Sequence, residues 1–159
     1  VFVRSNQQRV THLPDHEHTT PDKGGSMLEM QIDFPGGTLV NAHFGHHTVV
    51  TDQPPEGGGS DSAPGPFLLF LASIGTCAGI YVLYFCQKRK LSLDGIRILQ
   101  RVHYTTGTKN VETIELEIQV PNSFPEKYLP ALIRAADQCK VKQHLENPPE
   151  ITTVTRVVA

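Results

Sequence analysis

Cysteine is scarce in this chain, and so is any excess of positive charge. There are three cysteines among 159 residues and no C-x-x-C motif, which excludes a secreted disulfide framework and a zinc knuckle. The formal net charge is -2, so the chain lacks the basic field that nucleic-acid binding usually needs. The first residues contain no apolar segment typical of a signal peptide. We therefore expect a cytoplasmic protein without a nucleic-acid partner.

Charged residues are absent from one long stretch, residues 67–86. Pro64 and Pro66 precede it and the basic residues 88–90 follow it, which predicts one long helix. Its apolar side chains occur on every side, so something must cover it all round. The length would allow a membrane crossing. The small and polar residues 73–79 in its middle instead favour a helix buried in a globular core that a second copy of the chain completes.

Alternating apolar and polar residues before this helix predict strands. The pattern starts at Leu28, turns at residues 35–37 and gives a three-stranded antiparallel meander that ends near Val50. A loop rich in proline and glycine, residues 52–65, then leads to the helix.

Beyond the helix the alternation returns and predicts a hairpin over residues 96–120 that turns at residues 106–110. A second helix is expected from about Pro130 to Leu145, because an internal proline favours a helix start. The β-branched residues 151–158 predict a last strand. The fold class is therefore α+β, with antiparallel sheets wrapped around a long central helix in the order βββ-α-ββ-α-β.

Residues 1–26 show no hydrophobic periodicity and end in Gly24-Gly25-Ser26 directly before Met27. That junction is typical of a segment added upstream of a start codon. We expect residues 1–26 to be a leader or a remnant of cloning, and residues 27–159 to form a single domain. The three histidines of the leader have no cysteine or predicted helix beside them to fix metal-ligand geometry, so no metal site is predicted.

Two of the cysteines are predicted to point into the core. Cys77 lies in the middle of the long helix beside Gly75 and Gly79, whose missing side chains leave room for a ligand or a second helix. Cys139 follows apolar positions of the second helix by three and seven residues, which places it on the buried face. Cys86 faces the opposite side of the long helix from Cys77 and is expected to fill the core. On composition alone, all three could be inert buried thiols.

Two motifs resemble the OsmC / organic hydroperoxide resistance (Ohr) family. Residues 63–77 read A-P-G-P-F-L-L-F-L-A-S-I-G-T-C, which is similar to that family's central helix, where a proline and an apolar run precede small residues and the first cysteine. Residues 139–145 read C-K-V-K-Q-H-L, which resembles the second motif, where cysteine is followed by proline, by valine or isoleucine, and by leucine at the sixth position. The order of elements fits as well, and the resemblance covers about residues 28–159.

The resemblance implies both a fold and a chemistry. The fold would be an intertwined homodimer in which strands of both subunits wrap the long helices. The chemistry would be that of an oxidoreductase of the oxidative stress response, a peroxidase in which Cys77 attacks the O–O bond of an organic hydroperoxide and becomes a sulfenic acid. Cys139 would condense with it to a disulfide, which a dithiol reductant such as dihydrolipoamide would reopen. No bound cofactor, metal or membrane is expected.

The resemblance is incomplete where the family activates its first cysteine. Family peroxidases use an arginine from the N-terminal strands and a glutamate just after the helix-starting proline. Here Phe67 follows Pro66, and no arginine lies between Arg9 and Arg89. Without a partner, burial would raise the pKa of the thiol. The candidate substitutes are Arg4 and Arg9 of the leader, His43, His46, His47, Lys140 and Lys142.

Two functions from different classes are therefore left open. In the first, the chain is an OsmC-like hydroperoxide reductase that uses Cys77 and Cys139. In the second, the same fold is a non-catalytic binding module for a small apolar ligand, or a redox sensor, and the cysteines are structural or redox-sensing. The arrangement of the two cysteines is the first observation that bears on this choice, because a disulfide needs their Cα atoms within about 7 Å.

Overall fold

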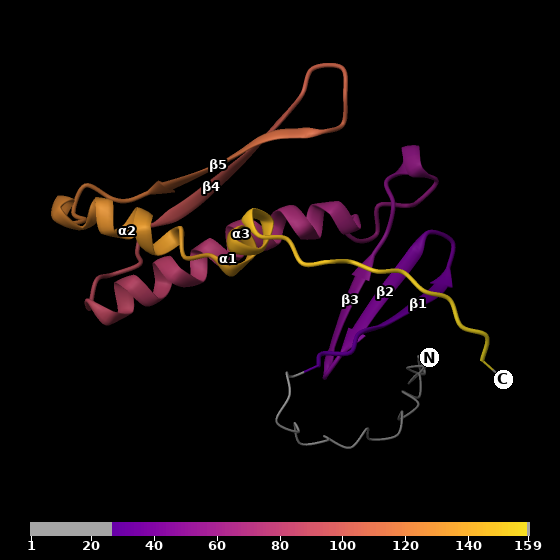
Figure 1. Cartoon of the computed structure of the whole chain (residues 1–159). Coiled ribbons are helices and arrows are strands. Elements are labelled where there is room, and N and C mark those ends of the chain that lie inside the picture. Colours follow the sequence, from indigo (N-terminus) through magenta and orange to yellow (C-terminus); the bar gives the residue numbers. More distant parts are fainter. Residues whose placement is uncertain (1–26, 159) are drawn as a thin grey trace, which may run out of the picture.

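Two antiparallel sheets and three α-helices make up residues 27–158, the part of the chain that the computed structural model describes (Figure 1). The predicted α+β class is confirmed, as is the order of the first seven elements. Along the chain the elements are β1 (Gln31–Gly36), β2 (Leu39–Phe44), β3 (His47–Thr51), the 3-10 helix η1 (Pro55–Gly57), α1 (Pro66–Lys88), β4 (Arg97–Tyr104), β5 (Val111–Gln119), the 3-10 helix η2 (Glu126–Tyr128), α2 (Leu129–Ala136) and α3 (Lys140–Glu146).

Helix α1 is the element on which most of the others pack. It contacts β4 on one face and α2 and α3 on another, while β1, β2 and β3 form a separate sheet near its N-terminal end (Figure 1). Its buried residues recur every three or four positions, so they form one stripe. They are Leu71, Ile74, Ala78, Val82, Phe85 and Cys86.

The other faces of α1 are not covered by this chain. Phe67 is 51% exposed, Leu68 57% and Tyr84 57%, although all three lie on the helix that the sequence predicted to be covered all round. By length and hydropathy α1 would also suffice to span a membrane, a property that core helices of soluble proteins share. A single chain therefore buries only part of the apolar surface of α1.

A single carboxylate organises the loop between β3 and α1. Asp52 is 2% exposed and accepts hydrogen bonds from the Thr38 hydroxyl at 2.5 Å, from the Ser62 hydroxyl at 2.7 Å and from the Gln53 main chain at 2.8 Å. Ser60 adds its hydroxyl and its N–H. The Thr38 hydroxyl and the two bonds from Ser62 hold the pKa of Asp52 far below its usual range, against the effect of burial. This carboxylate therefore ties the β1–β2 turn to the residues just before α1.

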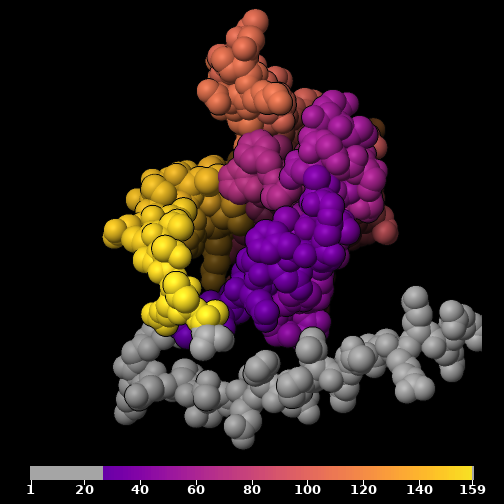
Figure 2. All heavy atoms as spheres, turned by 90° about the vertical axis from the view of Figure 1, so that its right-hand side faces the viewer, coloured from indigo at the N-terminus to yellow at the C-terminus, as the bar shows by residue number. Residues whose placement is uncertain are grey.

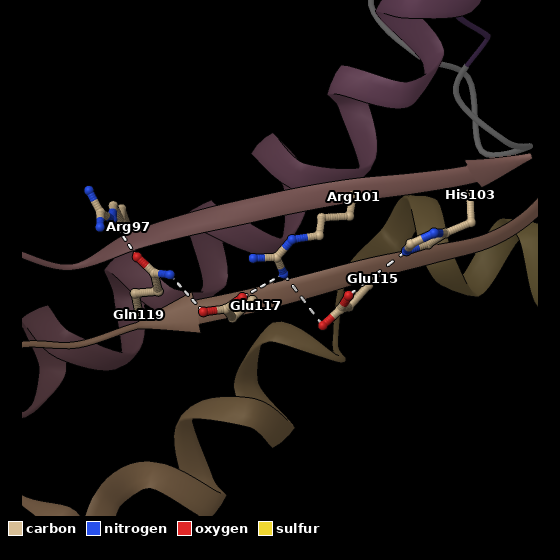
Figure 3. Close-up of polar contacts among 6 residues, drawn as sticks. All are labelled: Arg97, Arg101, His103, Glu115, Glu117 and Gln119. Atoms are coloured by element: carbon tan, nitrogen blue, oxygen red, sulfur yellow. Dashed lines mark hydrogen bonds and ion pairs between the residues drawn. The ribbon is translucent and has the colours of Figure 1, made fainter.

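The β4–β5 hairpin has one apolar and one polar face. Ile98 packs against the core, and Gln100 donates to the Leu71 carbonyl of α1 at 2.9 Å. Side chains alternate along a strand, so the charged residues lie on the other face. Figure 3 shows them as a ladder across the two strands, and Figure 2 shows the tip of the hairpin (orange) projecting from the molecule. The ladder consists of Arg97, Arg101 and His103 on β4 and Glu115, Glu117 and Gln119 on β5.

Arg101 is the centre of this ladder. Its guanidinium lies 2.5 Å from Glu117 and 3.5 Å from Glu115. The hydrogen bond to Glu117 raises the pKa of Arg101, and the hydrogen bonds from Gln119 and then Arg101 lower the pKa of Glu117. The charges of the hairpin are thus largely neutralised by one another.

The expected second helix, from about Pro130 to Leu145, is wrong in one respect. The structure has two short helices, α2 and α3, separated by a turn at residues 137–139. Cys139 has an extended backbone with ψ 120°, and its sulfur accepts from the Lys142 N–H at 3.4 Å. A side chain that caps the next helix in this way ends the continuous hydrogen-bond ladder. The break turns Cys139 toward α1.

The expected last strand over residues 151–158 is also wrong for this chain. These residues form no strand in the structure, and Ile151, Val154 and Val157 are 87%, 89% and 97% exposed. β-Branched residues favour a strand only where a neighbouring strand is available to pair with. Within residues 27–158 no strand pairs with this segment, although β1 and β3 each leave one edge of their sheet open.

Two glycines of α1 face β4, but they are not equivalent. A Cβ atom added to Gly75 would lie 2.7 Å from the Gln100 side-chain oxygen, whereas one added to Gly79 would meet Ile98 at an ordinary 3.8 Å. The space expected beside Cys77 for a ligand or a second helix is thus taken by Gln100 at Gly75.

This difference predicts different changes in stability for two matched substitutions. Gly79→Ala is expected to stabilise the fold by about 1 kcal/mol, the usual helix-propensity gain. Gly75→Ala is expected to lose that gain, because Gln100 must give up its bond to Leu71, worth about 1 kcal/mol. Urea denaturation of both variants, and of Gly75→Ala in a Gln100→Ala background, measures the difference. Equal stability of the two single variants would contradict the contact.

Candidate redox site

The two cysteines singled out by the sequence lie together in the structure. Cys77 is half-buried on α1, and Cys139 is 1% exposed at the start of α3. The Cys139 thiol donates to the carbonyl oxygen of Ile74, three residues before Cys77, at 3.8 Å, and each of the two cysteines affects the pKa of the other. Both are free thiols. The turn that divides α2 from α3 brings this pair together across 62 residues of sequence, from 77 to 139.

The surroundings of Cys77 favour its anionic form. Burial is the largest influence and by itself raises the pKa of Cys77. The main-chain N–H of Val141, the Cys139 thiol, the main-chain N–H of Lys140 and the charge of Lys140 act in the opposite direction. Together they outweigh burial, so the pKa of Cys77 lies below the ordinary value for a thiol. A thiolate is the nucleophilic form of cysteine.

The surroundings of Cys139 favour its protonated form. Burial is again the largest influence and raises the pKa of Cys139, and donation to Cys77 raises it further. The N–H groups of Lys142 and Val141 act in the opposite direction but do not prevail. The two sulfurs are therefore not equivalent, because their surroundings lower the pKa of Cys77 and raise the pKa of Cys139.

Of the substitutes proposed for the absent arginine, one lysine lies at the site. Lys140 acts on Cys77 with its charge, while the Lys142 ammonium is 2.7 Å from Asp137. His43 bonds to Asp33 and Thr48 within the β1–β3 sheet, and His46 and His47 lie against each other at the β2–β3 turn. Arg4 and Arg9 lie outside the described residues.

Sequence reasoning missed the main-chain N–H of Val141, which lowers the pKa of Cys77 more than the N–H or the charge of Lys140 does. No residue type signals a backbone donor. A predicted helix start directly after Cys139 would have been the useful signal, because the first N–H groups of a helix have no partner within it.

The third cysteine is a core residue, as the sequence predicted. Cys86 is 0% exposed and belongs to the same cluster as Val82, Phe85 and Leu132. Burial raises its pKa, and the charge of Arg89 offsets this only in part. Cys86 is therefore a thiol without access to solvent.

A hollow of about 630 Å³ lies between α1 and β4. Its lining is mainly apolar, with Leu83, Ile98 and the two α1 glycines on its walls and Arg97 at its edge. Cys77 does not line it, because the glycines are two positions away from Cys77 on the helix and so lie on a different face. The structure therefore separates the hollow from the pair of sulfurs. Within residues 27–158 no three metal-ligating side chains come together.

A scan against protein-family models matches residues 58–154 to the family described as OsmC-like protein. These residues make up more than half of the chain. The chain belongs to the OsmC-like family. The resemblance seen in the two cysteine motifs is thereby confirmed, and the match includes both Cys77 and Cys139.

Solved structures share the fold of this OsmC-like chain at low sequence identity. A protein from Psychrobacter arcticus 273-4, named for osmotic stress induction and a detoxification response, is 15% identical with a TM-score of 0.63, and the match covers 76% of this chain and 90% of that one. The OsmC-like protein of Mycoplasma pneumoniae is 15% identical, with a TM-score of 0.58 and coverage of 77% and 89%. Identities this low show a common fold and leave the activity open.

A third similar structure is named for resistance to organic hydroperoxides. It is an organic hydroperoxide resistance protein from Vibrio cholerae with captopril bound in one of its active sites, 17% identical, with a TM-score of 0.53 and coverage of 80% of this chain and 90% of that one. A comparison with curated protein sequences finds no match. The OsmC-like chain is thus placed in a redox protein family, and its substrate has to be argued from its own residues.

Proposed function

We propose that this OsmC-like chain reduces organic hydroperoxides through a two-cysteine cycle in which Cys77 attacks and Cys139 resolves. The observation that carries the proposal is the position of the buried Cys139 thiol, 3.8 Å from the Ile74 carbonyl one helical turn before the half-buried Cys77, together with a lowered pKa at Cys77 and a raised pKa at Cys139. A peroxidase needs both, because the thiolate attacks the peroxide and a nearby thiol removes the sulfenic acid before it is oxidised further.

The first step oxidises Cys77. Its thiolate attacks one oxygen of the hydroperoxide, an S–O bond forms and the O–O bond breaks, and the alkoxide that leaves takes up a proton to become an alcohol. Cys77 is then a sulfenic acid. In the second step the Cys139 sulfur attacks the Cys77 sulfur, an S–S bond forms, and water leaves. An external dithiol then exchanges with the disulfide and is itself oxidised, which returns both cysteines to thiols.

The surroundings of Cys77 support an organic substrate. Cys77 packs against the apolar cluster that includes Ala78 and Leu132, and Val141 packs against the same cluster, so apolar side chains lie on one side of Cys77. An apolar wall favours the alkyl or aryl part of an organic hydroperoxide over hydrogen peroxide. Cytoplasmic action, where reduced thiols are maintained, is part of the proposal.

A second copy of the chain is the partner that the exposed apolar surface requires. Ile32 and Phe34 on the first sheet are 50% and 78% exposed, and three large side chains of α1 are more than half exposed. Apolar surface on this scale is unusual for a monomer. We propose a homodimer, with a solution mass of twice 17.5 kDa in light scattering. A monomer at micromolar concentration would contradict it.

The decisive experiment titrates thiols before and after one equivalent of an organic hydroperoxide such as cumene hydroperoxide. We expect two of the three thiols to disappear per chain and Cys86 to remain, with peptide mass analysis locating a Cys77–Cys139 disulfide. Dihydrolipoamide should then restore both thiols and support continuous turnover. Three unchanged thiols after the peroxide is added would rule out the cycle.

One observation favours a second function, the binding of a small apolar ligand. The hollow between α1 and β4 is separate from the sulfurs, so a ligand there would not depend on redox chemistry. A fluorescent fatty-acid probe tests this. Binding that survives Cys77→Ser and is lost in Gly79→Leu, which fills the hollow, would support a binding module. Absence of binding to the wild type would exclude it.

A further inference from the structure

The Cys139 sulfur makes two contacts with different elements. Its thiol donates to the Ile74 carbonyl of α1 at 3.8 Å, and the same sulfur accepts from the Lys142 N–H of α3 at 3.4 Å. The second contact is the side-chain cap of α3, because it gives a partner to an N–H that the helix itself leaves unpaired. One sulfur atom therefore links α3 to α1 and also caps the N-terminal end of α3.

Helix α3 has few other contacts that hold it in place. It lies against α1, but it is seven residues long and none of its residues is buried (Figure 1). Val141 packs against the edge of the core cluster. The ion pair between Lys142 and Asp137 joins side chains that are 45% and 55% exposed, so it adds little stability. A helix this short is marginal in water without such support. The contacts of Cys139 and Val141 are therefore the main support of α3 within residues 27–158.

Formation of the disulfide changes both contacts of the Cys139 sulfur. When this sulfur attacks the sulfenic acid of Cys77, an S–S bond forms, and the thiol hydrogen leaves with the sulfenic hydroxyl as water. The Cys139 sulfur then has no hydrogen to donate to the Ile74 carbonyl. It also has to approach the Cys77 sulfur to about 2 Å. Because hydrogen bonds weaken steeply when their geometry is distorted, the contact with the Lys142 N–H weakens as well.

We propose that the disulfide between Cys77 and Cys139 uncaps α3, so that residues 140–146 are helical in the reduced protein and open in the oxidised protein. The proposal rests on the proposed two-cysteine cycle and deepens it. Cys139 is 1% exposed in the reduced protein, and the rate of thiol–disulfide exchange depends on access to the sulfur under attack. Opening of α3 uncovers the disulfide for the external dithiol. Reduction restores the thiol, and with it the cap.

The test measures hydrogen exchange of the main-chain amides of residues 140–146 by mass spectrometry of peptides from the full chain. Reduced protein is compared with protein treated with diamide, an oxidant that takes up the two hydrogens of a dithiol as the disulfide forms. We expect these amides to exchange about three- to tenfold faster after oxidation, the factor that corresponds to the loss of a cap worth about 1 kcal/mol. Peptides of α2 are the internal reference and should change less than about twofold, because Leu132 remains in the core.

Three variants separate the cap from the disulfide. Cys139→Ala has no cap, so its α3 should exchange in the reduced state as fast as that of the oxidised wild type. Cys139→Ser keeps a cap, because serine is a preferred N-cap residue, and diamide should leave its α3 unchanged. Cys77→Ser is the matched control that retains the Cys139 thiol and cannot form the disulfide. Thermal melting curves check folding, and Cys77→Ser with the wild type carries the test if Cys139→Ala does not fold.

The inference is overturned if the disulfide forms and residues 140–146 exchange at the same rate or more slowly, or if diamide speeds their exchange equally in Cys77→Ser. Because diamide forms the disulfide without a hydroperoxide, the result does not depend on turnover. Faster exchange with diamide, but three unchanged thiols after cumene hydroperoxide, would retain the switch and reject the peroxidase. A disulfide formed by cumene hydroperoxide with unchanged exchange would do the reverse. Failure of both oxidants to join the cysteines would overturn both proposals.

Discussion

Cys77→Ser is expected to lose organic hydroperoxide reduction by about 10³-fold or more, because a serine hydroxyl in this position has no base to make it a nucleophile. The loss should appear in dithiol-dependent consumption of cumene hydroperoxide. It should also appear in a single-turnover experiment, in which no thiol disappears. The expected loss is large because a single atom, the Cys77 sulfur, forms the bond to the peroxide oxygen.

The other two cysteines supply the controls for this experiment. Cys86→Ala should keep most of the activity, since Cys86 is buried in the core and does not contact the site. Cys139→Ser should consume one equivalent of peroxide to form a sulfenic acid at Cys77, and a second equivalent should oxidise that to sulfinic acid, because no thiol remains to capture the sulfenic acid. Turnover by Cys77→Ser comparable to the wild type would remove the basis of the proposed mechanism.

Leu132→Ala is expected to lower the free energy of unfolding by about 2–5 kcal/mol. Leu132 is 1% exposed and belongs to the cluster that joins α2 to Ala78, Val82 and Phe85 of α1. A loss of this size is a large share of the 5–15 kcal/mol that typically stabilises a domain. Urea denaturation measures it, and the neighbouring Ile133→Ala, at a side chain that is 57% exposed, should cost far less.

Leu132→Ala should also affect the redox site. Helix α2 leads directly into the turn that carries Cys139, so a weakened contact between α1 and α2 leaves the distance between the two sulfurs less well defined. We expect slower disulfide formation after peroxide in Leu132→Ala than in Ile133→Ala. Equal stability of the two variants would show that the core described for α1 and α2 is wrong.

The parts of the fold that could be predicted from sequence are those in which local pattern and burial agree. Residues 114–118 alternate between apolar and charged side chains, and they form part of β5, with Ile114 less exposed than both of its neighbours. Helix α1 begins at Pro66, within the predicted stretch, because proline is tolerated in a first turn. Each of these signals lies within a few residues of the structure it predicts.

The errors came from interactions between distant parts of the chain. Residues 137–139 break the second helix because Cys139 turns toward α1 and caps α3, and a helical pattern carries no record of such a contact. Residues 151–158 have the composition of a strand, but no strand of the described chain pairs with them, and composition does not show whether a partner strand is within reach. For the same reason, the spacing of the motifs could name Cys77 and Cys139 but could not choose among the seven candidate substitutes for the missing arginine, of which Lys140 is the one that lowers the pKa of Cys77.

The carboxylate of Asp52 helps to hold the first sheet, β1–β3, in place relative to α1. Apart from the chain itself, β1–β3 share few contacts with α1, and the bonds from Thr38, Ser60 and Ser62 converge on this one side chain at the joint. The orientation of the β1–β3 sheet relative to α1 therefore depends on the carboxylate of Asp52. As the pH falls below about 4, where an unfolded carboxyl takes up its proton, the stabilisation that Asp52 gives to this sheet declines progressively, and it is lost in full only when the carboxyl is protonated in the folded state at a much lower pH.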